Sequence, residues 1–158
     1  MEMNHRVVDA GFKVLNLVHR SILRSTGSRL GASAFGLRFV ELHTVGRRTG
    51  RERAVVLASP VVEGDRYVLV ASKGGDARDP DWFKNLLVQP EVVLKIGVRS
   101  VPARARVASE DEAAQLWPRI IAAYRPYASY RRRTTRTIPL VICEPRDEAA
   151  GGGVTSSP

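Results

Sequence analysis

The chain has 158 residues, of which 44% are hydrophobic, so one domain with a sizeable core is expected, and the apolar runs are too short to span a membrane. Its 25 basic and 16 acidic residues give a net charge of +9, which favours an anionic partner: nucleic acid, an acidic membrane face or a phosphorylated cofactor. The single cysteine, Cys143, excludes an internal disulfide and a cysteine-based metal site.

Residues 5–24 predict an amphipathic helix, because apolar side chains recur at helical spacing on one face and basic side chains lie on the other. Two interpretations stay open: the apolar stripe packs on the core, or the basic helix rests on an anionic membrane. Residues 1–30 lack the pattern of a secretory signal. We therefore expect a cytoplasmic protein, with any peripheral membrane contact at the inner face of the cell membrane.

Residues 25–36 are rich in Gly and Ser and predict a loop, after which short runs of β-branched residues begin. We expect strands at 37–44, 53–59, 66–72, 92–98, 101–107 and 138–144. Short turns join most of them, which favours a closed antiparallel barrel with few helices over a parallel α/β sheet. The expected organisation is an N-terminal amphipathic helix (1–30), a β-barrel domain (31–145) and a disordered tail (146–158).

Two helices are expected between the strands. Asp79-Pro80-Asp81 has the pattern of a helix start, with Asp79 as the capping acid and Pro80 in the first helical position, and this helix ends before Pro90. Ser109-Glu110-Asp111-Glu112 is a capping box that opens a second helix, which continues through Ile121.

A turn rich in arginine joins the first two strands, with the sequence Gly46-Arg47-Arg48-Thr49-Gly50-Arg51-Glu52-Arg53. Its glycines allow a tight turn with exposed backbone N–H groups, and its four arginines suit phosphate or carboxylate oxygens. The spacing is neither that of a P-loop nor that of a dinucleotide-binding fingerprint. A solvated hairpin tip is the alternative, and composition favours neither. We call residues 46–53 the arginine turn.

A second candidate site is Ala71-Ser72-Lys73-Gly74-Gly75-Asp76-Ala77-Arg78-Asp79-Pro80-Asp81-Trp82. Here a strand ends in a hydroxyl, a cation and two glycines just before a helix start, where a ligand can approach the backbone and anions are favoured. Ser72 has the chemistry to hydrogen-bond a ring carbonyl, and its alternative role is that of a simple strand-end hydroxyl. Trp82 either walls a planar ligand or belongs to the core.

The third candidate is Tyr124-Arg125-Pro126-Tyr127-Ala128-Ser129-Tyr130, followed by Arg131, Arg132 and Arg133. Three tyrosines spaced three apart present aromatic faces and phenolic donors that suit a flat quinone-like or nitroaromatic substrate. Half-buried packing and the stacking of nucleic-acid bases are the alternatives. His5, His19 and His43 show no metal-ligand spacing, so no metal is expected.

Five segments between residues 37 and 145 together resemble the deazaflavin-dependent nitroreductase family of actinobacteria. They are Thr44-Val45-Gly46-Arg47-Arg48-Thr49-Gly50, Val70-Ala71-Ser72-Lys73-Gly74-Gly75, Pro80-Asp81-Trp82-Phe83-Lys84-Asn85-Leu86, Tyr124-Arg125-Pro126-Tyr127-Ala128-Ser129-Tyr130 and Arg136-Thr137-Ile138-Pro139-Leu140-Val141-Ile142-Cys143-Glu144-Pro145. The resemblance implies a split antiparallel β-barrel, related in shape to flavin-mononucleotide oxidases, and the cofactor coenzyme F420, an 8-hydroxy-5-deazaflavin.

The resemblance also implies roles for individual residues. The phosphate and glutamate tail of the cofactor would contact Arg47, Arg48, Thr49 and Arg53. The deazaflavin ring would be bordered by Ser72, Lys73 and Gly74 and walled by Pro80, Trp82 and Asn85. Over the substrate, a mobile lid would be formed by Tyr124, Tyr127 and Tyr130. Ala58 falls where some members have a tyrosine, and residues 125, 128 and 129 also differ, so the substrate is not carried over.

The reaction expected is hydride transfer from reduced F420 to a small-molecule acceptor: a quinone, a nitroaromatic or an activated alkene. The hydroxyls of Ser72, Tyr127 and Tyr130 are the expected catalytic donors, because negative charge develops on the acceptor oxygen. Ala58 is expected beside the substrate. The alternatives are a flavin-dependent oxidase of the same barrel type and a basic module that binds nucleic acid or a membrane surface; under the leading hypothesis no nucleic-acid partner is expected.

Overall fold

The computed structural model describes residues 33–34 and 37–146 of the chain. Its strands are β1 (Ser33–Ala34), β2 (Leu37–Val45), β3 (Glu52–Ser59), β4 (Val61–Glu63), β5 (Arg66–Val70), β6 (Glu91–Ile96), β7 (Arg99–Val107) and β8 (Leu140–Pro145). Its helices are the short 3₁₀ helix η1 (Lys73–Gly75), α2 (Asp81–Val88), α3 (Glu110–Ala123) and α4 (Pro126–Arg133).

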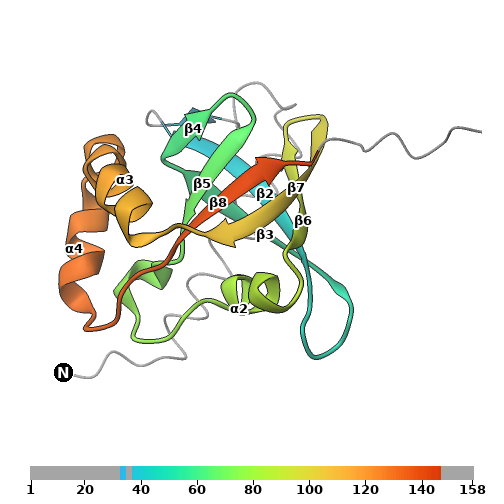
Figure 1. Ribbon diagram of the computed structural model, residues 1–158, viewed down its shortest axis with the longest axis horizontal. Helices are drawn as coiled ribbons and strands as arrows, with labels where there is room; N and C mark the ends of the chain where they lie inside the picture. The colour runs from blue at the N-terminus through green and yellow to red at the C-terminus, as the bar shows by residue number, and fades with distance from the viewer. Residues whose placement is uncertain (1–32, 35–36, 147–158) are drawn as a thin grey trace, which may run out of the picture.

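The strands form one antiparallel sheet in the order β3-β2-β6-β7-β8-β5-β4, and β1 also pairs with β2. The sheet curls so that β3 contacts β5, although these two strands are not paired. The result is a split antiparallel β-barrel, as the family resemblance implies. In Figure 1, α2 lies across one end of the barrel, whereas α3 and α4 lie together at its side.

Alternation along the strands separates two hydrophobic clusters. Inside the barrel, Leu42, Leu69 and Leu94 pack against Phe83 of α2. On the outer face of β5 and β8, Val68 and Leu140 belong to a second cluster with α3 and α4. Each strand residue that points outward from β5 therefore meets the helices, and each inward one meets the core.

Several predicted elements differ from the observed ones. The expected loop at 25–36 contains the two-residue strand β1, and the short strand β4, which the sequence pattern did not predict, pairs with β5. The third expected strand ends at Val70 instead of residue 72, and the last begins at Leu140 instead of 138. The capping box of Ser109 with Glu112 is confirmed.

The start of α2 also corrects a prediction. Pro80, with extended backbone, is the N-cap, and no side chain caps this end. The carboxylate of Asp79 instead accepts a hydrogen bond from Arg136 Nη1 at 2.9 Å. The Asp79 carboxylate thus accepts a hydrogen bond from the distant Arg136 in place of one from the backbone N–H groups at the start of α2.

The expected N-terminal helix and C-terminal tail lie outside the described residues. Among the helices of residues 37–146, none is long and apolar enough to cross a membrane.

Candidate functional site

The arginine turn is a tight hairpin end between β2 and β3. The backbone N–H of Gly46 donates to the carbonyl of Arg51 at 2.7 Å, and the N–H of Gly50 donates to the carbonyl of Gly46 at 2.8 Å. Gly50 has φ +66°, a left-handed conformation that favours glycine. The geometry exposes Arg48 and Arg53 to solvent.

Arg47 behaves differently from its neighbours because α2 holds it. Its backbone N–H and its Nη1 both donate to Oδ1 of Asn85, at 3.2 and 3.0 Å, and its Nη2 lies 3.1 Å from Asp81 Oδ1. Asn85 is buried and donates through Nδ2 to Thr44 Oγ1 at 3.3 Å. The first two turns of α2 therefore fix the position of the arginine turn.

The one acidic residue of the arginine turn, Glu52, is engaged by a neighbour. Its Oε1 lies 2.9 Å from Nδ1 of the buried His43, whose Nε2 lies 2.8 Å from Glu41 Oε1. The hydrogen bond to His43 lowers the pKa of the Glu52 carboxyl. Because the register pairs His43 with Ala54 and Glu52 with Val45, both side chains point to the outer face of the hairpin.

The segment after β5 has an uncommon backbone. Lys73, Gly74 and Gly75 have φ angles of +45°, +65° and +85°, so three consecutive residues lie in the left-handed region. Such a conformation is unfavourable for a residue with a side chain, here Lys73, and persists only where surrounding contacts impose it. Ser72, directly before these residues, is buried, and its hydroxyl makes no capping hydrogen bond to η1.

The three tyrosines lie together at the junction of α3 and α4. The Tyr127 ring meets those of Tyr124 and Tyr130 edge to face, with centroids 5.4 and 5.8 Å apart. Burial raises the pKa of the Tyr127 phenol well above its usual range, and burial together with Tyr124 raises that of Tyr130. Both hydroxyls are protonated at neutral pH, as ordinary phenols are, and can donate hydrogen bonds; the raised pKa values extend this protonation to more alkaline pH.

The tyrosine helix α4 lies directly on the segment after β5. A Cβ atom added to Gly75 would come within 2.9 Å of the Tyr130 carbonyl oxygen and 3.0 Å of Arg133 Cβ. This glycine is therefore required by a close approach of two backbones, in addition to its positive φ. Two of the three candidate sites predicted from the sequence are thus in contact.

Ala58 lies on the outer face of β3. Its neighbours in the strand, Leu57 and Val55, pack on the inner core, so alternation directs Ala58 outward. Since β3 contacts β5, and the outer face of β5 carries α3 and α4, Ala58 shares the outer surface of the barrel with the tyrosines.

The three predicted wall residues, Pro80, Trp82 and Asn85, are all buried. Trp82 is 9% exposed and packs in the inner core, edge to face with Phe83 at 6.2 Å between centroids. Pro80 is buried at the start of α2, and Asn85 anchors Arg47. These positions favour a packing role for Trp82 and a role for Asn85 that acts through the arginine turn.

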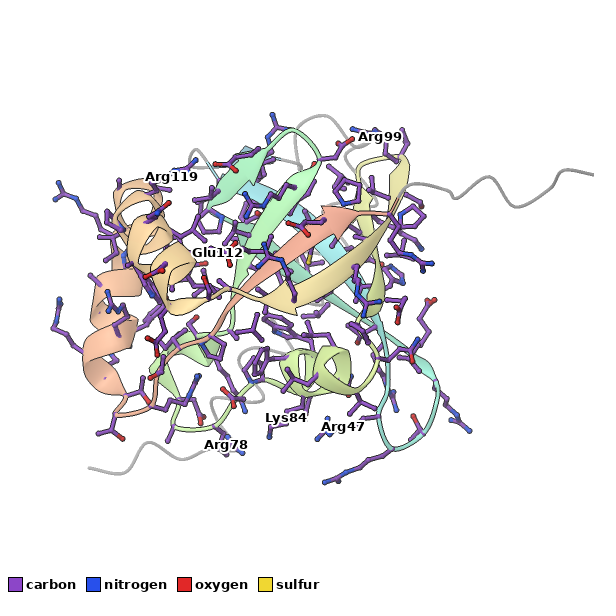
Figure 2. The ribbon with its side chains drawn as sticks, in the orientation of Figure 1. Arg47, Arg78, Lys84, Arg99, Glu112 and Arg119 are labelled. Carbon is purple, nitrogen blue, oxygen red and sulfur yellow. The ribbon has the colours of Figure 1, made fainter. Side chains whose placement is uncertain are left out.

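Two cationic side chains near the candidate site, Arg136 and Lys84, have no role predicted from the sequence. Arg136 spans the segment after β5 with hydrogen bonds to Ala71, Ser72, Asp76 and Asp79. Lys84, in α2, lies with Arg47 and Arg78 along the edge of the molecule that α2 covers (Figure 2). The sequence carries no signal for Arg136, because neither periodicity nor spacing distinguishes it from the other arginines of the Tyr/Arg-rich stretch. Within residues 33–34 and 37–146, no group of His, Cys, Asp and Glu side chains has the arrangement of a metal site.

The split antiparallel barrel thus carries the arginine turn, the glycine-rich strand end and the tyrosine helix, and a barrel of this kind is found in a solved F420-H2-dependent reductase. Residues 16–145 match the family model described as F420H(2)-dependent quinone reductase. The chain therefore belongs to the F420H(2)-dependent quinone reductase family, and it is an F420-dependent oxidoreductase.

Individual relatives agree with this assignment. An F420H(2)-dependent quinone reductase of Mycobacterium tuberculosis is 36% identical over 137 residues, which cover 84% of this chain and 90% of the relative. A solved F420-H2-dependent reductase, FDR-A, is 37% identical and superposes with a TM-score of 0.61 over 67% of this chain and 93% of its own. A chain solved as a domain-swapped dimer is 33% identical, with a TM-score of 0.64 over 83% and 96%.

Proposed function

We propose that coenzyme F420 binds with its phosphate and glutamate tail along the arginine turn and its ring against Ser72, Lys73 and Gly74, beside the tyrosines of α3 and α4. The observation that carries the proposal is the continuity of these elements. The arginine turn is bonded to α2 through Asn85, five residues join the glycine segment (Lys73–Gly75) to the start of α2, and the glycine segment touches α4.

The charges of the arginine turn fit an anionic tail. Arg48 and Arg53 are exposed, while the nearby acid Glu52 is engaged by His43 on the outer face. Arg47 is already held by Asn85 and Asp81, so we assign it two roles: it fixes the arginine turn on α2, and it contributes to the surface that contacts the cofactor tail. Guanidinium groups in this setting bind phosphate and carboxylate oxygens through paired hydrogen bonds.

When bound, reduced F420 supplies a hydride, and the chain supplies binding, orientation and hydrogen bonds. We assign to Ser72 the hydroxyl nearest the ring and to Tyr127 and Tyr130 hydroxyls on the acceptor side. Both phenols are neutral at physiological pH and can stabilise negative charge on an acceptor oxygen by donating a hydrogen bond, and their raised pKa values keep them neutral in alkaline solution. The tyrosine rings also exclude water from that side of the site.

The acceptor we propose is a quinone, with nitroaromatics and activated alkenes as further candidates. The family description names quinones, and flat aromatic acceptors suit the three tyrosine rings. Ala58, on the adjacent outer face of β3, leaves more room than the tyrosine of some relatives. We expect this small side chain to widen the range of acceptors that fit.

Peripheral contact with an anionic membrane at the inner face of the cell membrane is also part of the proposal. The net charge of +9 and the exposed Arg131, Arg132 and Arg133 at the end of α4 support it, because clustered cations attract anionic lipid. Sedimentation with liposomes of anionic and of zwitterionic lipid tests it. Binding to neither, at low salt, contradicts it.

Titration of the purified chain with oxidised F420, followed by quenching of deazaflavin fluorescence, tests the cofactor placement. We expect saturable binding, and hydride transfer to a soluble quinone that falls when Ser72 is replaced by Ala at saturating cofactor. A yellow flavin that copurifies with the chain, without F420 binding, would instead indicate the flavin-dependent oxidase. A 260/280 absorbance ratio that is high at low salt and normal at high salt would indicate nucleic-acid binding.

A further inference from the structure

Arg136, just beyond the end of α4, makes four hydrogen bonds to the segment between β5 and α2. Its Nη2 donates to the carbonyl oxygens of Ala71 and Ser72 at 3.0 and 3.1 Å. Its Nε donates to the carbonyl of Asp76 at 2.9 Å, and its Nη1 donates to Asp79 Oδ1 at the same distance. The side chain is only 16% exposed.

These four bonds lie on both sides of the left-handed residues. Ala71 and Ser72 precede Lys73, Gly74 and Gly75, whose φ angles are all positive. Asp76 and Asp79 follow them. One guanidinium group therefore bonds the backbone both before and after residues 73–75. Among the described residues, this is the one stretch with three consecutive positive φ angles.

The same arginine connects this segment to the tyrosine helix. Arg136 follows α4 in the chain, and the Tyr130 carbonyl lies against Gly75. The chain beyond Arg136 stays in contact with the segment, because the N–H of Ala71 donates to the carbonyl of Pro139 at 3.0 Å. A displacement of Arg136 would therefore affect both residues 71–79 and the tyrosine helix α4.

We propose that Arg136 is a positioning residue for hydride transfer: it holds residues 71–79 in the conformation that borders the deazaflavin ring and keeps the tyrosine helix on that segment. The inference rests on the proposed placement of the ring at Ser72, Lys73 and Gly74. Arg136 touches neither ring nor acceptor and acts through the backbone it binds. Small displacements of reacting groups cost large factors in rate, so this role is measurable.

Lysine cannot replace arginine here. The guanidinium group is planar and presents five N–H donors in a fixed fork, whereas an ammonium group is a single point with three donors. Nε, Nη1 and Nη2 each have a different partner, on both sides of the turn. Arg136→Lys retains the positive charge but cannot bond acceptors on both sides of the left-handed residues. It therefore distinguishes an effect of the hydrogen bonds from an effect of the charge alone.

The experiment uses the full chain with Arg136→Lys, Asp79→Asn and, as a matched control, Arg106→Lys. Arg106 also binds two acceptors, Glu112 and Glu144, but lies on β7, away from the segment. Three quantities are measured: amide hydrogen exchange of residues 72–78 without cofactor, the dissociation constant for F420, and the single-turnover rate of hydride transfer at saturating cofactor.

We expect faster exchange at residues 72–78 in Arg136→Lys and a rate lower by about 10- to 100-fold. The F420 dissociation constant should change less, because the arginine turn holds the tail. Asp79→Asn, which leaves Arg136 in place, should show a smaller effect in the same direction and keeps the inference testable if Arg136→Lys folds poorly. Arg106→Lys keeps a cation beside the carboxylates of Glu112 and Glu144, so α3 stays attached, and exchange at residues 72–78 and the rate should be unchanged.

Unchanged exchange at residues 72–78 in Arg136→Lys would overturn the inference, and so would faster exchange combined with a wild-type rate. Equal losses in Arg136→Lys and Arg106→Lys would also overturn it, because they would show a general loss of stability. Failure of the wild-type chain to bind F420 is a separate result, which removes the cofactor placement and the inference with it.

Discussion

Arg47 and Asn85 are joined by two hydrogen bonds to a single oxygen: the backbone N–H and the Nη1 of Arg47 both donate to Asn85 Oδ1. The two residues are 38 positions apart, and their contact ties the end of the β2–β3 hairpin to α2. One buried amide thus determines where the exposed arginines of the turn lie.

Replacing Asn85 by Ala should therefore weaken F420 binding without removing any exposed cation. Loss of the acceptor leaves buried polar groups unpaired, so we also expect a loss of about 1–3 kcal/mol in the free energy of unfolding. Asn85→Asp retains the acceptor oxygen and should keep most of the affinity. Fluorescence titration and urea denaturation of both variants measure these effects; equal affinity in Asn85→Ala and wild type would contradict the anchoring role.

Gly75→Ala should displace the tyrosine helix. The added methyl group meets Tyr130 O at 2.9 Å and Arg133 Cβ at 3.0 Å, and the position has φ +85°. Gly64→Ala is the matched control, since Gly64 has φ +60° with nothing within 4 Å of the added Cβ.

Both substitutions carry the cost of the left-handed conformation, about 1 kcal/mol. Only Gly75→Ala adds overpacking, worth about 1–3 kcal/mol, and only it should lower quinone reduction. Thermal unfolding and steady-state rates compare the two. Equal destabilisation with equal activity would show that α4 is not held by this contact.

The antiparallel barrel and most of its strands were predictable because alternation, glycine turns and the Ser109 capping box are local signals. The strand β4 was missed because three residues are too few to show a period. The role of Asp79 was wrong for a different reason. A capping motif describes competition within one segment, and Arg136, 57 residues away, supplied a stronger partner.

The candidate site shows the same division. The arginine turn, the glycine segment and the tyrosines are recognisable by composition, and the contact between the last two required the fold. Neither the engagement of Glu52 by His43 nor the hydrogen bonds of Arg136 has a sequence signal, because each depends on the register of strands or on a loop path.

Tyr127→Phe should lower the rate of hydride transfer by about tenfold or more while leaving the fold intact, because the ring contacts remain and only the hydroxyl donor is lost. Burial raises the pKa of the Tyr127 phenol, so the wild-type rate should show no loss from ionisation of this group as the pH rises to about 10. Single-turnover rates over this pH range measure both effects. If the wild-type rate falls near pH 10 and the Tyr127→Phe rate does not, the Tyr127 phenol ionises at its usual pKa, which contradicts its burial.

Acid should weaken the attachment of α3 to the barrel. Hydrogen bonds from Arg106, at 2.7 and 2.8 Å, lower the pKa of Glu112 from 4.5 to about 2. Since the folded-state pKa is depressed, the stabilisation is complete above pH 4.5 and is lost as the pH falls toward 2. Urea midpoints measured across this range should fall less steeply in Glu112→Gln than in wild type. Parallel curves would contradict the prediction.

The most direct test of the cofactor placement is a comparison of two ligands: F420, which carries the phosphate and glutamate tail, and the same deazaflavin without that tail. Arg48→Ala and Arg53→Ala should each weaken F420 binding by about 3- to 10-fold and leave the tail-less deazaflavin unaffected. Arg99→Ala, at the far end of the molecule in Figure 2, makes the same change of charge and should affect neither ligand. Equal weakening of both ligands, or of neither, would contradict the placement of the tail along the arginine turn.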